Sequence, residues 1–351
     1  MIGRAARDGE FAQRVVAWQR AFGRRDLPWL GESDPYRVWL SEIMLQQTQV
    51  ATVRAYYMRF LQAFPDVGTL AAAPLDDVLA LWSGLGYYSR ARNLHHCSQA
   101  VMRDHGGTFP LRSDDLASLP GIGRSTAAAI AVFCHGERAA ILDGNVKRVL
   151  ARYLGFDGDL GRSGPQRSLW QQAEALLPQR DVEDYTQGLM DLGATLCLAR
   201  NPQCTQCPVR RACVAHRQDR VDELPVKSPR ARRGTRANAL LWLRHRDRVL
   251  LVRRPEQGVW AGLWSLPEFD DLDALNGVVW DWPGRGSALA PIDHALTHFD
   301  WHLAPLRWDL PARVSAAQRS RIEATVPGGR WMGHDEALAM SLPAPVRKLL
   351  G

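Results

Sequence analysis

The sequence lacks any long apolar run. None reaches about eighteen residues, so no segment is expected to cross a membrane as a helix. The first residues, MIGRAARDGEF, lack the apolar core of a secretory signal, and we expect a cytoplasmic protein. There are no internal repeats or low-complexity tracts. With 46% hydrophobic residues, the chain is not a disordered one.

Lysine is also scarce. Only three of the 44 basic residues are lysines, namely Lys147, Lys227 and Lys348, so a Schiff-base mechanism has few candidate amines. The net charge of +7 favours a polyanionic partner such as DNA. An arginine excess also arises from a GC-rich genome, so charge alone does not identify the partner.

A chain of 351 residues is too long for one ordinary core and predicts two domains. Residues 1–213 have a helical pattern, with one helix expected from Trp39 until Pro65 stops it after Phe64. Glu42 lies at the margin of its apolar face, about 60° from Trp39. Residues 214–236 are basic and poor in apolar side chains, which predicts a linker. Residues 237–351 contain short apolar runs and predict a small α+β domain.

Four of the six cysteines form one cluster with the spacing C-x6-C-x2-C-x5-C: Cys197, Cys204, Cys207 and Cys213. Disulfides are not maintained in the cytosol, so this spacing indicates a metal or a cluster. Zinc sites are usually built from two separate C-x-x-C pairs, whereas one compact loop, here residues 197–213, is typical of iron–sulfur proteins. We therefore predict a [4Fe–4S] cluster, with zinc as the alternative.

A glycine hairpin, LPGIGRST, lies between two helical stretches and contains Gly121, Gly123 and Ser125. Two glycines allow a tight turn, after which the amides at the start of the next helix can hold a phosphate oxygen. Two such glycines alone also fit an ordinary turn. With its flanking residues the segment resembles the helix-hairpin-helix motif, which binds the DNA backbone without reading the base sequence.

These features in this order resemble the helix-hairpin-helix DNA glycosylases of the endonuclease III superfamily over the first 213 residues. Four strings are similar to its adenine DNA glycosylase (MutY) branch: LPW at 27–29, DPYRVWLSEIMLQQTQVATV at 34–53, WSGLGYYSRARNL at 82–94 and the hairpin. The resemblance implies a mainly α N-terminal domain, with a six-helix barrel and an iron–sulfur subdomain. A Nudix-like α+β domain would follow it.

The resemblance implies specific catalytic roles. Removing adenine requires the nucleotide to be flipped out of the duplex, and an acid with a carboxylate suits an oxocarbenium-like transition state. Glu42 would protonate the base, Asp143 would stabilise the cationic sugar and Asn145 would orient the site. We expect desolvation to raise the pKa of Glu42, and loop amides to keep Asp143 ionised.

Other residues are implied in DNA contact. Gln47, Tyr87 and, less directly, Leu45 correspond to side chains that fill or wedge the base stack. Ser125 stands where glycosylase-lyases of the superfamily carry their nucleophilic lysine, so the resemblance implies a monofunctional enzyme. Lys147 could still form an adventitious adduct.

The string RVLLVRRPEQGVWAGLWSLPEF resembles the opening strands of a Nudix (MutT-like) domain. The paired glutamates of the catalytic Nudix helix do not follow, so pyrophosphate hydrolysis is not expected. In the family this domain recognises 8-oxoguanine with a Phe-Ser-His loop. This chain has Leu296-Thr297-His298, so the resemblance implies lesion contact by Thr297 and His298, with a leucine in place of the family's phenylalanine.

The predicted protein is a cytoplasmic, nucleoid-associated monomer without a membrane partner. It removes adenine opposite 8-oxoguanine or guanine in duplex DNA and starts base excision repair. Three alternatives remain. They are a glycosylase-lyase for oxidised pyrimidines, a non-catalytic iron–sulfur protein that binds damaged DNA, and a Nudix hydrolase fused to a DNA anchor.

Overall fold

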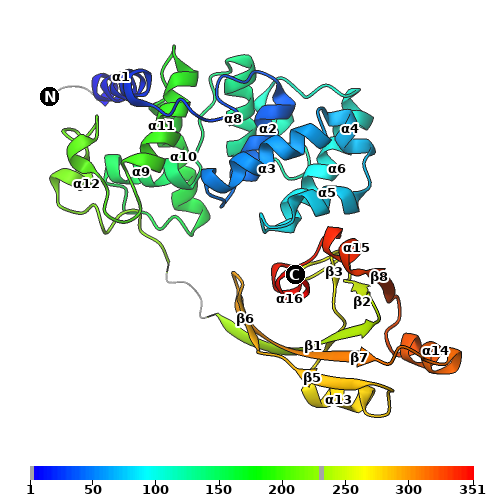
Figure 1. Ribbon diagram of the computed structural model, residues 1–351. Helices are drawn as coiled ribbons and strands as arrows, with labels where there is room; N and C mark the ends of the chain where they lie inside the picture. The colour runs from blue at the N-terminus through cyan, green and yellow to red at the C-terminus, as the bar shows by residue number, and fades with distance from the viewer. Residues whose placement is uncertain (1–3, 229–232) are drawn as a thin grey trace. The chain divides into compact units, whose positions relative to one another are not determined.

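The computed structural model describes residues 4–228 and 233–351 (Figure 1). The chain forms two compact units. The first contains Met1–Ala72 and Asn93–Arg230, and the second contains Ala73–Arg92 and Ala231–Gly351. In the described parts of both units, no helix is both long and apolar enough to span a membrane.

The first unit is helical. Its elements are α1 (Arg4–Phe22), α2 (Pro35–Leu45), α3 (Val50–Ala63), α4 (Val67–Ala72), most of α6 (Tyr88–His105), α7 (Ser113–Leu116), α8 (Arg124–His135), α9 (Gly144–Leu154), α10 (Ser163–Ala175), α11 (Val182–Thr195), the 3-10 turn η1 (Cys204–Gln206) and α12 (Val214–Arg217). α5 (Leu75–Trp82) and the first turn of α6 belong to the second unit.

Local sequence explains where these helices begin and end. Asp34 caps α2 by accepting a hydrogen bond from the amide of Tyr36 at 2.9 Å, and Pro35 occupies the first turn, where its missing N–H costs nothing. α8 and α9 end at Gly136 and Gly155, whose φ angles of 63° and 64° are left-handed.

The single helix predicted from Trp39 to Phe64 is wrong. α2 ends at Leu45 and α3 begins at Val50, because Gln47 takes a left-handed φ of 58° and stops the helical hydrogen bonding. Trp39 and Val53 are nonetheless fully buried. The apolar spacing therefore continues through a break made only by polar residues.

The core of the first unit joins α1, α8, α9, α10 and α11. Its buried members include Phe11, Val132, Leu150, Leu169 and Leu192. α9 lies within this core and extends from the Asp143 cap at one end to Tyr153, beside the cysteine loop, at the other. This helix therefore connects two of the predicted functional regions.

The second unit is built on one mixed sheet. Its strands are β1 (Gly234–His245), β2 (Arg248–Arg253), β3 (Trp264–Ser265), β4 (Glu268–Phe269), β5 (Arg285–Ala288), β6 (Ile292–Ala295), β7 (Phe299–Leu310) and β8 (Arg330–Gly333). β1 and β7 pair in parallel along their full lengths, from Gly234 opposite Phe299 to His245 opposite Leu310. β2, β5, β6 and β8 are added antiparallel.

Helices complete this unit: α13 (Leu272–Val279), α14 (Ala316–Thr325), α15 (His334–Ala339) and α16 (Ala344–Leu350). Leu275 of α13 and Ile322 of α14 are buried in one core with Leu241 of β1 and Leu306 of β7. The predicted fold class, a helical part followed by a Nudix-like α+β part, is confirmed.

Candidate functional site

A cavity of about 1350 Å³ in the first unit brings together all three predicted catalytic residues. α2 and the turn after it, the start of α8 and the start of α9 each contribute to its wall. The predicted site residues that line it are Glu42, Leu45, Gln47, Ser125, Asp143 and Asn145.

Glu42 projects from α2 and is half-buried. Burial raises the pKa of its carboxyl to about 7, and the negative charge of Asp143 adds to the rise. A raised pKa was predicted for this residue from its place beside the apolar face. At neutral pH the carboxyl is therefore protonated in a large fraction of molecules and can donate a proton.

Asp143 is the N-cap of α9. Its Oδ1 accepts a hydrogen bond from the amide of Val146 at 2.7 Å. Burial raises the pKa of this carboxyl, while the amides of Val146 and Asn145 lower it, and the net direction is upward. The amides predicted to keep Asp143 ionised are therefore present, but they offset only part of the desolvation.

Asn145 and Arg148 lie one turn apart on α9. Asn145 Oδ1 accepts from the Arg148 guanidinium at 2.8 Å, and the same guanidinium donates to the carbonyls of Gly193 and Cys197, each at 2.6 Å. Sequence reasoning missed Arg148. Its spacing of three residues from Asn145 was the available signal, because such pairs share a helix face.

The glycine hairpin has the expected tight turn. Gly121 has a φ of 75°, and a Cβ there would lie 2.6 Å from the Cβ of Asn93. Gly123 is the N-cap of α8, without a side-chain cap, and a Cβ there would meet nothing within 4 Å. Ser125 lies on the first turn of α8, and its Oγ accepts from the amide of Leu142 at 3.0 Å. The hairpin is thus tied to the loop before Asp143.

The four clustered cysteines line one small apolar cavity in the first unit. Beside it, the buried Arg152 donates to the carbonyls of Leu198 at 2.6 Å and Val221 at 2.9 Å, and lies 3.4 Å from Cys197 Sγ. Sequence reasoning did not single out Arg152. Among residues 4–228 and 233–351, no three His, Cys, Asp or Glu side chains form a ready-made site for a single metal ion.

Lys227 also lines the large cavity, although the sequence places it in the predicted linker. The preceding residue is fixed to the first unit by the Leu160 amide, which donates to the Val226 carbonyl at 3.2 Å. Ser228 donates through its hydroxyl and its amide to Asp159. No motif marked Lys227, because its position depends on this docking.

The remaining predicted DNA contacts belong to the second unit. Tyr87 is 47% exposed and has a left-handed φ of 48°. Thr297 and His298 are exposed and form the two-residue tip of the β6–β7 hairpin, which closes where the Leu296 amide donates to the Phe299 carbonyl at 2.9 Å. The cavity therefore belongs to the first unit and this tip to the second, and each is a separate part of the predicted site.

Comparison with known proteins adds a second kind of evidence. Residues 40–174 match the HhH-GPD superfamily of base excision DNA repair proteins, and residues 238–351 match the NUDIX domain. The chain is 33% identical to an adenine DNA glycosylase of Buchnera aphidicola over 345 residues, covering 97% of this chain and 96% of the relative. It is 30% identical to the human adenine DNA glycosylase, with 93% and 71% covered.

Solved structures resemble the helical part. A thermostable thymine-DNA glycosylase superposes with a TM-score of 0.54 and 28% identity, over 60% of this chain and 97% of its own. Endonuclease III in a non-covalent DNA complex superposes with a TM-score of 0.52 and 20% identity, over 62% and 98%. At 20% identity, the likeness to endonuclease III shows a shared fold and no more.

Proposed function

The chain belongs to the adenine DNA glycosylases of base excision repair, and on that premise we propose that it hydrolyses the N-glycosidic bond of adenine opposite 8-oxoguanine or guanine. The observation that carries the proposal is the pairing of Glu42 with Asp143 in one cavity, with the pKa of Glu42 near 7. A flipped adenine would enter this cavity, because the bond to be cleaved is inaccessible within the duplex.

In this proposal Glu42 is the general acid. Adenine leaves readily only when protonated, and a carboxyl with a pKa near the operating pH is a suitable donor. Asp143 acts as the carboxylate that stabilises the developing positive charge on the sugar, as in glycoside hydrolysis. Its cap bond to Val146 fixes one oxygen, which would leave the other oxygen for the substrate.

Asn145 is proposed to orient water and the sugar beside Asp143. Its Oδ1 is held by Arg148, so its amide nitrogen is the group left for the cavity. A fixed side chain loses less freedom when the transition state forms, which favours catalysis. Arg148 acts here as a positioning residue.

We propose a monofunctional enzyme that leaves an abasic site. The hairpin position occupied by a lysine in glycosylase-lyases is Ser125, and its hydroxyl oxygen accepts from the Leu142 amide. A Schiff base needs an amine, and a serine cannot supply one. The adjacent amides at the start of α8 would hold the DNA backbone, and the open space at Gly123 would allow its close approach.

Further DNA contacts are proposed for the residues that fill the base stack. Gln47, at the strained turn after α2, and Leu45 line the cavity, where side chains could replace the flipped nucleotide. Tyr87, exposed at a left-handed backbone position, would wedge the stack. Thr297 and His298 at the hairpin tip would contact the base opposite adenine.

We propose that Cys197, Cys204, Cys207 and Cys213 hold a [4Fe–4S] cluster. Four thiols on one cavity are the donor set for such a cluster, and Arg152 supplies hydrogen bonds to the surrounding loop. Its proposed task is structural: it would keep the arginine-bearing loop in place near the DNA phosphates.

Single-turnover cleavage tests the proposal. One duplex carries adenine opposite 8-oxoguanine, another carries thymine glycol, and each is sampled with and without hot alkali. Strand breaks only after alkali, and only in the adenine strand, are expected. Breaks without alkali in the thymine-glycol strand would identify a glycosylase-lyase. No cleavage of either duplex by a protein with an intact cluster would indicate a binding protein.

A further inference from the structure

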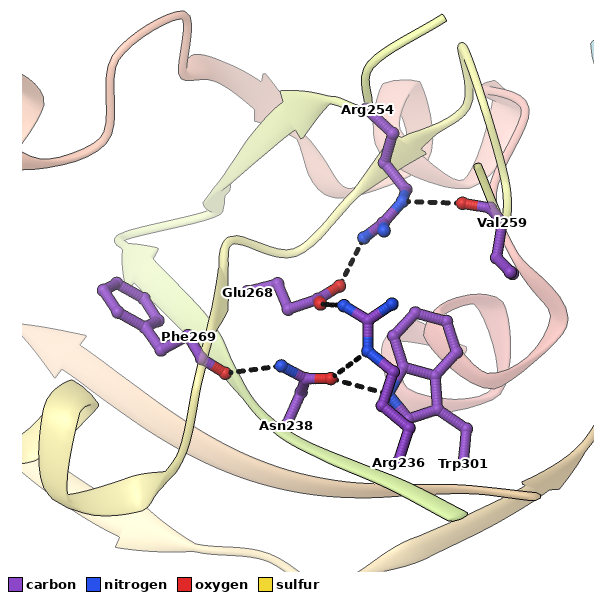
Figure 2. A network of polar contacts seen from close by, with 7 residues as sticks. All are labelled: Arg236, Asn238, Arg254, Val259, Glu268, Phe269 and Trp301. Carbon is purple, nitrogen blue, oxygen red and sulfur yellow. Dashed lines mark hydrogen bonds and ion pairs between the residues drawn. The ribbon is translucent and has the colours of Figure 1, made fainter. Parts of the chain in front are cut away.

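A half-buried carboxylate in the second unit bridges two arginines. Glu268 of β4 accepts a hydrogen bond from Arg236 of β1 at 2.6 Å and another from Arg254, and Figure 2 shows it between their guanidinium groups. The side chains of Glu268 and Arg254 are only 15% and 14% exposed. Apolar residues of similar volume would often be as stable there, so stability alone does not explain this arrangement.

Arg236 connects this carboxylate to the sheet through Asn238. Arg236 Nε donates to Asn238 Oδ1 at 2.8 Å, and the indole N–H of Trp301 donates to the same oxygen, also at 2.8 Å (Figure 2). Asn238 in turn donates to the carbonyl of Phe269 at 3.1 Å. Trp301 is fully buried, so its orientation is set by these polar contacts and by its packing.

An aromatic stack extends the network to the neighbouring loop and strand. The rings of Trp260 and Trp301 are stacked, with centroids 4.5 Å apart and planes 23° apart, and His294 lies 5.4 Å from Trp260. Arg254 Nε donates to the carbonyl of Val259 at 3.1 Å, which holds the backbone beside Trp260. Trp260 has a left-handed φ of 58°, a conformation that needs such support.

This stack lies under the tip of the β6–β7 hairpin. His294 of β6 pairs with Trp301 of β7, and the next pair toward the hairpin tip is Ala295 with Asp300. Side chains directly opposite each other on paired strands interact and stabilise the pairing. Any tilt of the His294–Trp301 pair would therefore move Thr297 and His298.

We propose that Glu268 is a positioning residue for recognition of the base opposite adenine: with Arg236 and Arg254 it holds the Trp260–Trp301 stack and so fixes the hairpin tip. This inference depends on the proposed function, in which the tip reads that base. Selectivity for the opposite base would then depend on a charge network that does not itself touch the DNA base.

Replacing Glu268 with glutamine should release the stack while changing few atoms. Arg236 and Arg254 donate to different oxygens of Glu268, and glutamine replaces one of those oxygens with an NH₂ group, so one of the two arginines loses its acceptor. The little-exposed Arg254 would lose its counter-charge and turn toward water, leaving the Val259 carbonyl beside Trp260 without this donor.

The experiment measures single-turnover rates of the full chain on adenine opposite 8-oxoguanine and opposite guanine. We expect wild type to prefer the first duplex, and Glu268→Gln to lower that preference about tenfold, equivalent to 1.4 kcal/mol. Glu336→Gln is the matched control, because it makes the same change in an exposed pair with Arg330 of the same unit. It should keep the wild-type ratio.

Thermal unfolding of each variant separates positioning from loss of fold. If Glu268→Gln does not fold, Arg236→Lys replaces it, since a lysine retains the charge but cannot hold Glu268 and Asn238 together. A folded variant with the wild-type ratio would overturn the inference. A wild type without any preference for 8-oxoguanine would instead overturn the proposed specificity, together with the inference that depends on it.

Discussion

The rate of adenine release should fall steeply as the pH rises above 7. The reason is the protonation of Glu42, which must carry a proton in order to give it to the base. Burial, together with the charge of Asp143, raises the pKa of this carboxyl from 4.5 to about 7. Because the acid form is the active one, activity is present below the pKa and is lost above it.

The magnitude follows from the protonated fraction. With a pKa near 7, about half of the molecules are protonated at pH 7, about a tenth at pH 8 and about a hundredth at pH 9. At pH 7 an ordinary glutamate with a pKa of 4.5 would be protonated in only about one molecule in three hundred. DNA phosphates add negative charge, so the midpoint in the complex should lie at or above 7.

Single-turnover rates with enzyme in excess, measured from pH 5 to 9 on adenine opposite 8-oxoguanine, check this expectation. Glu42→Gln should reduce the rate by at least about a hundredfold, a general-acid contribution, and remove the alkaline decline. In Asp143→Asn, the alkaline decline of any residual rate should begin at a lower pH than in wild type, because the charge of Asp143 no longer raises the pKa of Glu42. A wild-type rate that stays constant from pH 6 to 9 would refute the assignment of Glu42 as the acid.

Three further predictions concern other contacts. Ser125→Ala removes the acceptor of the buried Leu142 amide and should lower the free energy of unfolding by about 1–3 kcal/mol; an unchanged melting temperature would contradict this. Arg152→Met leaves the carbonyls around the cysteine loop without their donor, so the purified protein should show less iron per chain and weaker visible absorbance than wild type. Lys227→Ala should reduce the slope of log Kd against log salt for duplex DNA by about one, whereas the exposed Lys348→Ala should leave it unchanged. Equal slopes for the two variants would show that Lys227 makes no phosphate contact.

Several predictions depended only on residues close together in the chain, and these are the ones that sequence alone could make. The cysteine spacing predicted a cluster because the four cysteines lie within one loop. The glycine hairpin indicated a turn, and Gly121 does have a positive φ. Asp143 was expected to meet loop amides, and it caps α9 through Val146. Each of these depends on local backbone geometry, which local sequence largely specifies.

The break in the predicted helix shows where periodicity is insufficient. Trp39 and Val53 keep the apolar spacing on both sides of Gln47, so the pattern is the same for one helix or two. The left-handed backbone of Gln47 interrupts it, and glutamine gives no local signal for that conformation. Only the packed structure determines the turn that carries this residue into the cavity wall.

The sequence by itself determined the fold class and the family, because these reside in motifs and local patterns. It also led to the proposal of Glu42 and Asp143 for acid–base chemistry, through the resemblance that those motifs carry. Tertiary structure decided which distant groups meet. It placed Lys227 of the predicted linker on the cavity, joined Asn145 to the Cys197 carbonyl through Arg148, and set Trp301 opposite Arg236. Such contacts depend on helix packing and strand register, where a shift of one residue would reverse every side chain, so no local pattern specifies them.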